Sequence, residues 1–348
     1  MSDDSIPAEL KRYSAVHANP KGEGDARPTA LQIIKDNNLE GKWPDKTILI
    51  TGCSSGLGVA TTVALLATGA HVIATARSLP KLSTALSSFL PSPFPSNLTL
   101  LPLELTSLPS IRTFAATFLQ TTNHKLNILI GNAGVMALPT HTLTEAGHET
   151  QLATNHLGHF LLFQLLKPAL LASSSPSFSS RVVSLSSMAH RSGNIPFTDI
   201  NLLEPGAYTP GGAYANSKLA NIHFANAIER RYATQGIHAY SLNPGGIVDG
   251  SGLQTHIWDQ ISQMLKRDDV KCYMKNREQG AATTVWGAVA GVLEGKGGVF
   301  LEDCQVCGEW RPEMGMFARG WEKRAFDEES EERLWRVSNV LVGLSEEE

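Results

Sequence analysis

The sequence feature that most constrains the fold is a glycine-rich turn between an apolar run and an alanine-rich segment. Residues 47–51 read TILIT, residues 52–58 read GCSSGLG, and a segment of helical character continues through Ala67. A strand, a glycine turn and a helix in this order form the first unit of a dinucleotide-binding βαβ fold. Glycine lets the backbone turn and approach a phosphate, while the helix offers free N–H groups and its positive dipole end. With a plain tight turn as the alternative, the candidate cofactor-binding residues here are Gly52, Ser54, Ser55, Gly56, Leu57 and Gly58.

Apolar runs and helical segments alternate along the rest of the chain. The runs are short and rich in leucine or β-branched residues, and long helical patterns separate them. Strands that alternate with helices form βαβ units and a parallel sheet. We therefore expect an α/β protein with a single Rossmann-type, doubly wound parallel sheet and helices on both faces. The expected strands cover residues 47–51, 71–76, 98–103, 127–131, 181–185 and 238–242.

One sheet indicates one folded domain. Residues 1–45 are mostly polar, with a short helical stretch at residues 30–37, and we expect them to form an N-terminal arm that is an appendage. Residues 46–348 are expected to form the Rossmann catalytic domain that binds the cofactor. Substrate-covering loops and a C-terminal helix complete this domain.

The composition excludes several classes of function. With 42% hydrophobic and 18% charged residues among 348, the chain is that of an ordered globular protein. A net charge of −4 and scattered Lys and Arg residues give no footprint for nucleic acid. No segment is long and apolar enough for a membrane span or a signal peptide, so we expect a soluble, cytoplasmic protein with reduced cysteines. Cys304 and Cys307 form an isolated C-x-x-C pair, so ordinary thiols are expected and no metal site.

The end of the second strand predicts which dinucleotide is bound. An acidic residue at this place favours NAD, and an arginine favours the 2′-phosphate of NADP. The strand ends at Ala76 and Arg77, so it offers a guanidinium and no carboxylate. We therefore expect NADP, with a merely solvated Arg77 as the alternative.

Tyr214 and Lys218 are candidate catalytic residues because they lie four apart in a helical segment, residues 213–231. Residues at this spacing project from one face of a helix. An ammonium beside a phenol favours the phenolate, so we expect Lys218 to lower the Tyr214 pKa and to let the phenol exchange a proton with a substrate oxygen. Ser187 follows the strand at residues 181–185, at the sheet edge where ligands bind, and its hydroxyl could hold the same oxygen.

Two further segments carry amides near the expected cofactor site. The segment Asn132, Ala133 and Gly134 closes the strand at residues 127–131 and would line the cofactor floor. Asn155 lies in the next helical segment, residues 149–166, where it could hold a water that links Lys218 to solvent; a structural amide is the alternative.

With these motifs in order, the sequence resembles the short-chain dehydrogenase/reductase family over about residues 46–290, a match that also includes Asn243-Pro244-Gly245. The resemblance implies that Asn155, Ser187, Tyr214 and Lys218 form the catalytic tetrad. It also implies that Glu104 and Leu105 contact the adenine and that Pro244, Gly245 and Ile247 lie along the nicotinamide.

Several segments are similar to the retinol-dehydrogenase-like branch, including the dehydrogenase domain of WW-domain oxidoreductases. These segments are NHLGHF from Asn155, SSMAH from residue 186, YANSKLAN from Tyr214 and LWRVS from residue 334. Members of the branch act on lipophilic alcohols, aldehydes and ketones, and fungal members often tailor secondary metabolites. The resemblance therefore implies an NADP(H)-dependent oxidoreductase with a lipophilic small-molecule substrate. Dimers and tetramers are common in the family, so a homo-oligomer is expected as a possibility.

The sequence departs from the family at three places. Glu104 replaces the usual aspartate. The threonine that the family has shortly after Pro244-Gly245 is absent, and Asp249 occupies its expected position. Ser251, two residues further on, is the candidate that replaces it as a cofactor contact. The polar arm has no counterpart to the membrane anchor of many retinol dehydrogenases.

The loops at residues 190–212 and 251–275 are expected to cover the substrate. Their apolar side chains predict a lipophilic ligand, with simple packing of the loops as the alternative. The alternative function is a cofactor-binding interaction protein with little turnover, and the complete Ser187, Tyr214 and Lys218 set argues against it. The apolar residues in question are Ile195, Phe197, Tyr208, Leu253, Ile257, Trp258 and Met264.

Overall fold

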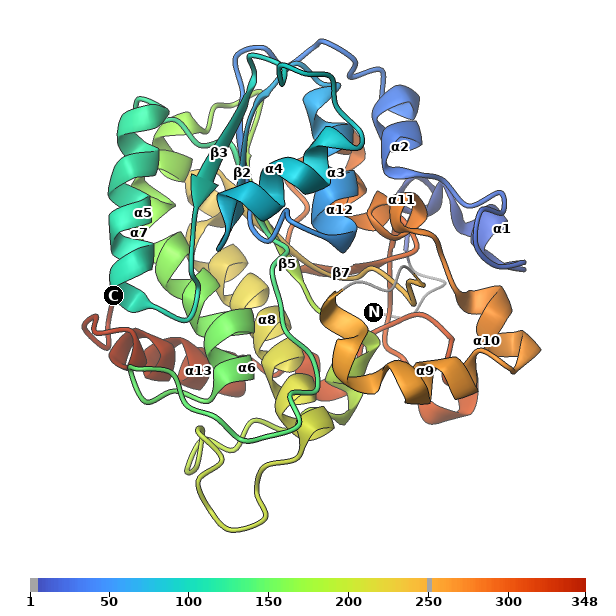
Figure 1. Ribbon diagram of the computed structural model, residues 1–348, viewed down its shortest axis with the longest axis vertical. Helices are drawn as coiled ribbons and strands as arrows, with labels where there is room; N and C mark the ends of the chain where they lie inside the picture. The colour runs from blue at the N-terminus through green and yellow to red at the C-terminus, as the bar shows by residue number, and fades with distance from the viewer. Residues whose placement is uncertain (1–5, 249–251) are drawn as a thin grey trace.

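The computed structural model describes residues 6–248 and 252–348, which form an eight-stranded sheet flanked by helices (Figure 1). The strand order is β3-β2-β1-β4-β5-β6-β7-β8, with every neighbouring pair parallel except β7 and β8. The predicted α/β class with a doubly wound parallel sheet is confirmed. The strands are β1 (Thr47–Ile50), β2 (His71–Ala76), β3 (Leu98–Pro102), β4 (Ile128–Gly131), β5 (Ser180–Leu185), β6 (Ile237–Asn243), β7 (Val299–Glu302) and β8 (Gln305–Val306).

Helices cover both faces of the sheet, as Figure 1 shows. Helices α5, α7 and α8 lie on one face, and α3 and α12 lie on the other. Several helices begin where a Ser, Thr, Asn or Glu side chain caps the first turn, for example Thr209 at the start of α8. The helices are α1 (Ser14–His17), α2 (Ala30–Asp36), α3 (Gly56–Leu66), α4 (Leu79–Ser87), α5 (Leu108–Thr121), α6 (Thr150–Leu152), α7 (Gly158–Ser173), α8 (Pro210–Tyr232), α9 (Trp258–Met264), α10 (Asp268–Tyr273), α11 (Arg277–Gly280), α12 (Ala282–Val289) and α13 (Glu328–Leu341).

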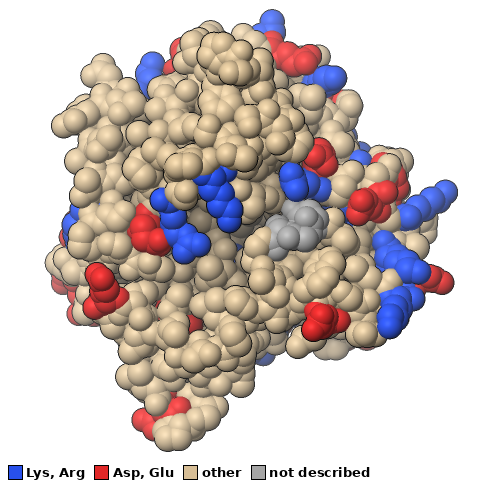
Figure 2. Space-filling view, in the orientation of Figure 1, with Lys and Arg blue, Asp and Glu red and all other residues tan. Residues whose placement is uncertain are grey.

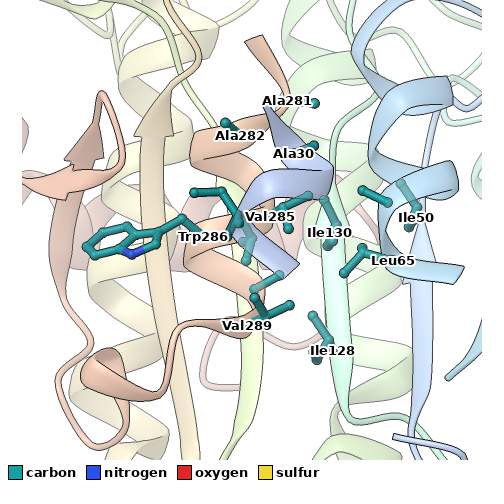
Figure 3. Close-up of a cluster of buried hydrophobic side chains, with 14 of the residues drawn as sticks. Ala30, Ile50, Leu65, Ile128, Ile130, Ala281, Ala282, Val285, Trp286 and Val289 are labelled. Carbon is teal, nitrogen blue, oxygen red and sulfur yellow. The ribbon is translucent and has the colours of Figure 1, made fainter. Parts of the chain in front are cut away.

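The core is divided by the sheet into two clusters, because successive residues of a strand point to opposite faces. Ile48 and Ile50 of β1 point into the cluster that Figure 3 shows, where they meet α3, α2 and α12. Leu49 points to the opposite cluster, which α5, α7 and α8 complete. Trp286 of α12 is fully buried in the first cluster.

The residues before β1 pack against the domain and do not form a free appendage. Ile33 and Ile34 of α2 are fully buried, and α2 contacts α12 and α3. Ile6 and Leu10 are buried at the edge of the same cluster. The side chain of Arg27 is also buried and donates hydrogen bonds to the carbonyls of Tyr273, the last residue of α10, and Met274. These apolar residues are too sparse in a polar sequence to give a periodic signal, which is why the packing was not expected.

The C-terminal helix α13 lies on the outer surface of α7 and α8. Its Trp335 is buried among Phe160, Phe163 and Phe224, and Arg231 lies over the indole ring. Polar contacts such as Gln164 Nε2 to Asn339 Oδ1, 2.8 Å, fix the register of the two layers. The helix is therefore an integral layer of the fold.

The surface in Figure 2 carries Lys and Arg side chains scattered among Asp and Glu, with no continuous basic area on the face shown. Across the described residues, no helix combines the length and apolar character that a membrane span requires.

Candidate active site

A cleft of about 710 Å³ runs along the carboxyl ends of the parallel strands. Open parallel sheets bind ligands at this edge. The turns after β1, β2, β4, β5 and β6 all contribute side chains or backbone to its walls. Nearly all of the predicted site residues in the described part of the chain line this one cleft; Asn155 lies directly behind Gly134.

The glycine turn after β1 has the shape that a pyrophosphate requires. Gly52 has a φ of +71°, and a Cβ at this position would lie 2.7 Å from Ala133 Cα. A Cβ at Gly58 would lie 2.3 Å from the carbonyl oxygen of Gly52. Helix α3 begins at Gly56, and no side chain caps its first N–H groups. The turn therefore leaves free N–H donors at a helix N-terminus beside the cleft, and it fits a dinucleotide phosphate.

The glycine turn is held by the end of β4. Asn132 Nδ2 donates to the carbonyls of Thr51, 2.8 Å, and Gly52, 3.2 Å. The hydroxyl of Thr51 accepts from Ala133 N at 3.0 Å and lies 2.8 Å from Nε2 of His159. This contact was not predicted for His159, because nothing in the sequence of α7 indicates that its ring reaches β1.

Arg77 lies at the far end of the cleft, after β2, with its side chain 76% exposed. Its Nε is 3.8 Å from a carboxylate oxygen of Glu104, which follows β3 and lines the same end of the cleft as Leu105. Lys81 also lines this end, and sequence reasoning missed it. Its spacing of four residues from Arg77, at the start of α4, is the signal that could have indicated it.

The predicted catalytic side chains meet at the other end of the cleft. Tyr214 and Lys218 lie on one face of α8, and Ser187 follows β5 and caps a short 3-10 helix. The Lys218 ammonium lies 5.6 Å from the Tyr214 ring centroid and donates to the Leu185 carbonyl at 3.0 Å. These three residues bring a phenol, an ammonium and a hydroxyl together at this end of the cleft, which we call the Tyr214 corner.

Burial controls the ionisation of this corner. Burial raises the pKa of Tyr214 to about 12, although a hydrogen bond with Ser187 opposes the shift. Burial also lowers the pKa of Lys218 to about 8. The expected lowering of the Tyr214 pKa by Lys218 is therefore not found, because the cost of burying a phenolate is the larger effect.

Asn155 lies in a π-helical turn, η3 (Ala153–Leu157), inserted between α6 and α7. π-Helical turns inside helices often mark functional sites. Its Nδ2 donates to the Val135 carbonyl, 2.9 Å, and to Ser217 Oγ, 2.8 Å, while Oδ1 accepts from Val135 N. A Cβ on Gly134 would lie 3.1 Å from Asn155 Oδ1 and 3.4 Å from Lys218 Nζ, so the two side chains flank this glycine. The side chain holds the backbone after β4, and a water link to Lys218 stays a prediction.

The two predicted covering loops differ in their relation to the cleft. From the second loop, Leu253, Ile257 and Met264 line the cleft, whereas Trp258 is exposed and is not among the lining residues. None of the described residues at positions 190–212 lines it. Ile195 is buried in the core, and Tyr208 OH donates to the Leu138 carbonyl at 2.6 Å.

The turn after β6 completes the wall beside Tyr214. Pro244, Gly245 and Ile247 line the cleft as expected. Ser251, proposed as a cofactor contact, and Asp249 lie outside the described residues.

A Rossmann sheet with a glycine turn at one end of its cleft and a Ser, Tyr and Lys group at the other defines a dinucleotide-dependent oxidoreductase. Residues 46–262 match the family model described as short chain dehydrogenase. The chain therefore belongs to the short-chain dehydrogenase/reductase family, and the predicted resemblance is confirmed.

Relatives with similar sequences support this assignment over nearly the full chain. A short-chain dehydrogenase/reductase of Penicillium roqueforti, prx1, is 44% identical over 336 residues, 96% of this chain and 96% of that protein. Retinol dehydrogenase 12 of Homo sapiens is 35% identical over 306 residues, 86% of this chain and 87% of that protein. A solved structure from Mycobacterium paratuberculosis, of an uncharacterized protein, has a TM-score of 0.65 at 30% identity and covers 86% of this chain and 94% of that one.

Proposed function

We propose that this oxidoreductase transfers hydride between NADP(H) and a lipophilic carbonyl or alcohol. The observation that carries the proposal is the shared cleft: Ser187, Tyr214 and Lys218 line the same continuous cavity as the glycine turn after β1. A dinucleotide whose pyrophosphate lies at this turn would extend along the cleft toward Tyr214. The nicotinamide, when bound, supplies or accepts the hydride.

The residues of the corner have separate roles in the proposed reduction. The Ser187 hydroxyl donates a hydrogen bond to the carbonyl oxygen of the substrate and stabilises its developing negative charge. The Tyr214 phenol donates its proton to that oxygen as the carbonyl is reduced. Lys218, held by the Leu185 carbonyl, places a positive charge beside the phenol and stabilises the phenolate that remains. Asn155 keeps the backbone after β4 in place behind Lys218.

The proposed preference for NADP rests on the charges at the far end of the cleft. Arg77 and Lys81 both line it there, so two cations are available to a 2′-phosphate. The guanidinium can bind a phosphate through parallel hydrogen bonds. Glu104 lies close enough to Arg77 to orient it.

The proposed lipophilic substrate rests on the walls near Ser187. These walls are formed mostly by aliphatic and methionine side chains, among them Val135, Met136, Met188, Ile257 and Met264. Apolar pockets with a few convergent polar groups bind apolar ligands through surface burial. The name of the human relative, a retinol dehydrogenase, agrees with such a substrate. The resemblance to fungal members supports a tailoring step in secondary metabolism as its setting.

We also propose a cytoplasmic location, which the free thiols of Cys53, Cys272 and Cys304 support. A homo-oligomer stays a prediction of the family resemblance.

The experiment is to supply the purified protein with NADPH and unbranched aldehydes of increasing length, and to follow the absorbance of the reduced nicotinamide. Each buried methylene contributes about 0.8 kcal/mol, so we expect kcat/KM to rise up to about fourfold per carbon until the pocket is filled. NADH in place of NADPH should give lower rates at equal concentration. Cofactor binding without consumption across the whole series would contradict the proposal.

A further inference from the structure

The turn from Pro244 to Gly246 forms the wall of the cleft after β6, beside the Tyr214 corner. Gly245 has a φ of +95°, and a Cβ there would lie 2.9 Å from Nζ and 3.1 Å from Cε of Lys275. The stem of Lys275 therefore packs directly against the side of this turn that faces away from the cleft. A side chain at position 245 would collide with the lysine.

Lys275 is buried, with 1% of its surface exposed, and the hydrogen bonds of its side chain go to this turn and to one carboxylate. Its Nζ donates to the Pro244 carbonyl at 3.2 Å and to Asp303 Oδ1 at 2.7 Å. Its backbone N donates to the Gly246 carbonyl at 2.8 Å. The lysine thus holds the first and the last residue of the turn.

Asp303 lies in the turn between β7 and β8, next to Glu302 at the end of β7. These two adjacent carboxylates contact the residues that support the Pro244–Gly246 turn. Asp303 contacts Lys275, and Glu302 accepts a hydrogen bond from Asn243 Nδ2 at 2.6 Å, at the end of β6. The amide N of Gly245 donates to Asn243 Oδ1 at 3.2 Å, so both carboxylates are linked to the turn.

A histidine and an arginine also lie beside Asp303. His17 Nε2 lies 3.8 Å from Oδ1, and an Arg319 nitrogen lies 3.6 Å from Oδ2. Burial alone would raise the pKa of Asp303, but Lys275, His17 and Arg319 together lower it. The carboxylate therefore stays ionised and keeps Lys275 directed at the turn.

A buried ion pair of this kind contributes little net stability, because the cost of desolvating both charges offsets their attraction. Apolar residues of similar volume would serve a purely structural role as well. The ion pair does supply something that apolar residues cannot, which is a hydrogen-bond donor aimed at the Pro244 carbonyl.

We propose that Lys275 and Asp303 are positioning residues that hold the Pro244–Gly246 wall in the shape that receives the nicotinamide ring. This inference rests on the proposed function. It adds two residues, 28 positions apart in the sequence, that touch neither substrate nor cofactor.

The test compares two ligands on a double variant, Lys275→Met/Asp303→Asn, which removes both charges of the ion pair. Arg319 loses its contact with Asp303 but is partly exposed to solvent. On the proposed function, NADPH would extend along the cleft from Arg77 to the Tyr214 corner, whereas 2′,5′-ADP would reach only the Arg77 end. If the double variant leaves about a tenth of the molecules with a competent wall, the Kd of NADPH rises about tenfold, while the Kd of 2′,5′-ADP stays within about twofold. Titration calorimetry measures both constants without any turnover. Hydrogen exchange should also become faster in the peptide that contains Gly245 and Gly246.

The matched control is Lys296→Met, which removes an exposed lysine paired with Glu9 at 3.8 Å and should change neither constant. An unchanged NADPH constant in the double variant would overturn the inference. An equal loss of both ligands would also overturn it, because this result would mean a general loss of structure. If the wild-type protein binds neither ligand, the proposed function itself fails.

Discussion

Nζ of Lys218 lies 5.6 Å from the centroid of the Tyr214 ring, one helical turn along α8, and donates a hydrogen bond to the Leu185 carbonyl. The hydrogen bond to the end of β5 therefore fixes the position of the lysine side chain beside the phenol. Both groups are buried, which favours the neutral form of each. The phenol is thus an acid that keeps its proton at neutral pH.

The pH dependence of carbonyl reduction should follow Lys218. With a pKa of about 12, Tyr214 stays protonated over the working range, whereas Lys218 loses its proton near its pKa of about 8. We expect kcat/KM to be constant from about pH 6 to about pH 7 and to fall above about pH 8. In Lys218→Met, kcat/KM should fall by about a hundredfold or more, and the decrease above about pH 8 should disappear. A wild-type profile that stays flat to about pH 10 would rule out the role of the ammonium.

Arg77→Ala should weaken NADPH and spare NADH. Loss of charge-assisted hydrogen bonds to a phosphate costs about 1.5–3 kcal/mol, so the Kd of NADPH should rise about 10- to 100-fold. The Kd of NADH should change by less than about twofold, because NADH has no 2′-phosphate. Fluorescence titration measures both constants. Arg311→Ala removes an exposed arginine paired with Glu313 at 3.3 Å and is the control. Equal weakening of both cofactors would contradict the assignment of Arg77.

Trp335→Ala should destabilise the protein, because the indole fills the space between α13 and the aromatic side chains of α7 and α8. Removal of a buried aromatic side chain costs about 3–5 kcal/mol of unfolding free energy. Urea denaturation measures this loss. Val340→Ala, on an exposed position of the same helix, should cost less than about 0.5 kcal/mol. Equal effects of the two substitutions would show that α13 is not an integral layer.

The protein should lose stability in mild acid. Burial lowers the pKa of His156 to about 3 and the pKa values of His159 and His190 to about 4. An unfolded histidine has a pKa of about 6.5, so the unfolded chain binds more protons, and the unfolding free energy falls as the pH drops from about 6.5 toward about 4.

Urea denaturation at about pH 7 and about pH 5 measures this acid dependence. His156→Gln should reduce the slope by about one proton. The same slope in His156→Gln as in the wild type would contradict the explanation.

The fold was predictable where its signals are local. The predicted ends of the six strands from β1 to β6 lie within about one residue of the observed ends, because runs such as residues 71–76 are continuous and bounded by helices. Strands β7 and β8 were missed, because they are short, and because Glu302 at the end of β7 and Asp303 after it make this stretch resemble a polar turn. The burial of Ile33 and Ile34 was missed as well, since it depends on α12, far away in the sequence.

The candidate site was likewise predictable where its signals are local and not where it depends on contacts between distant segments. The glycine turn and the spacing of Tyr214 and Lys218 are local patterns with a direct chemical meaning. The contacts of Lys275 with Asp303 and with the Pro244 carbonyl join three separate segments, and no spacing in the sequence indicates them. The raised pKa of Tyr214 could not be predicted either, because burial becomes known only when the surrounding elements are placed.

The role of Tyr214 as the proton donor is tested most directly by Tyr214→Phe, which removes one oxygen and keeps the ring. NADPH consumption with a substrate aldehyde should fall by about 10²–10⁴-fold, while the Kd of NADPH stays within about twofold of the wild-type value. Turnover at the wild-type rate in this variant would contradict the proposed mechanism.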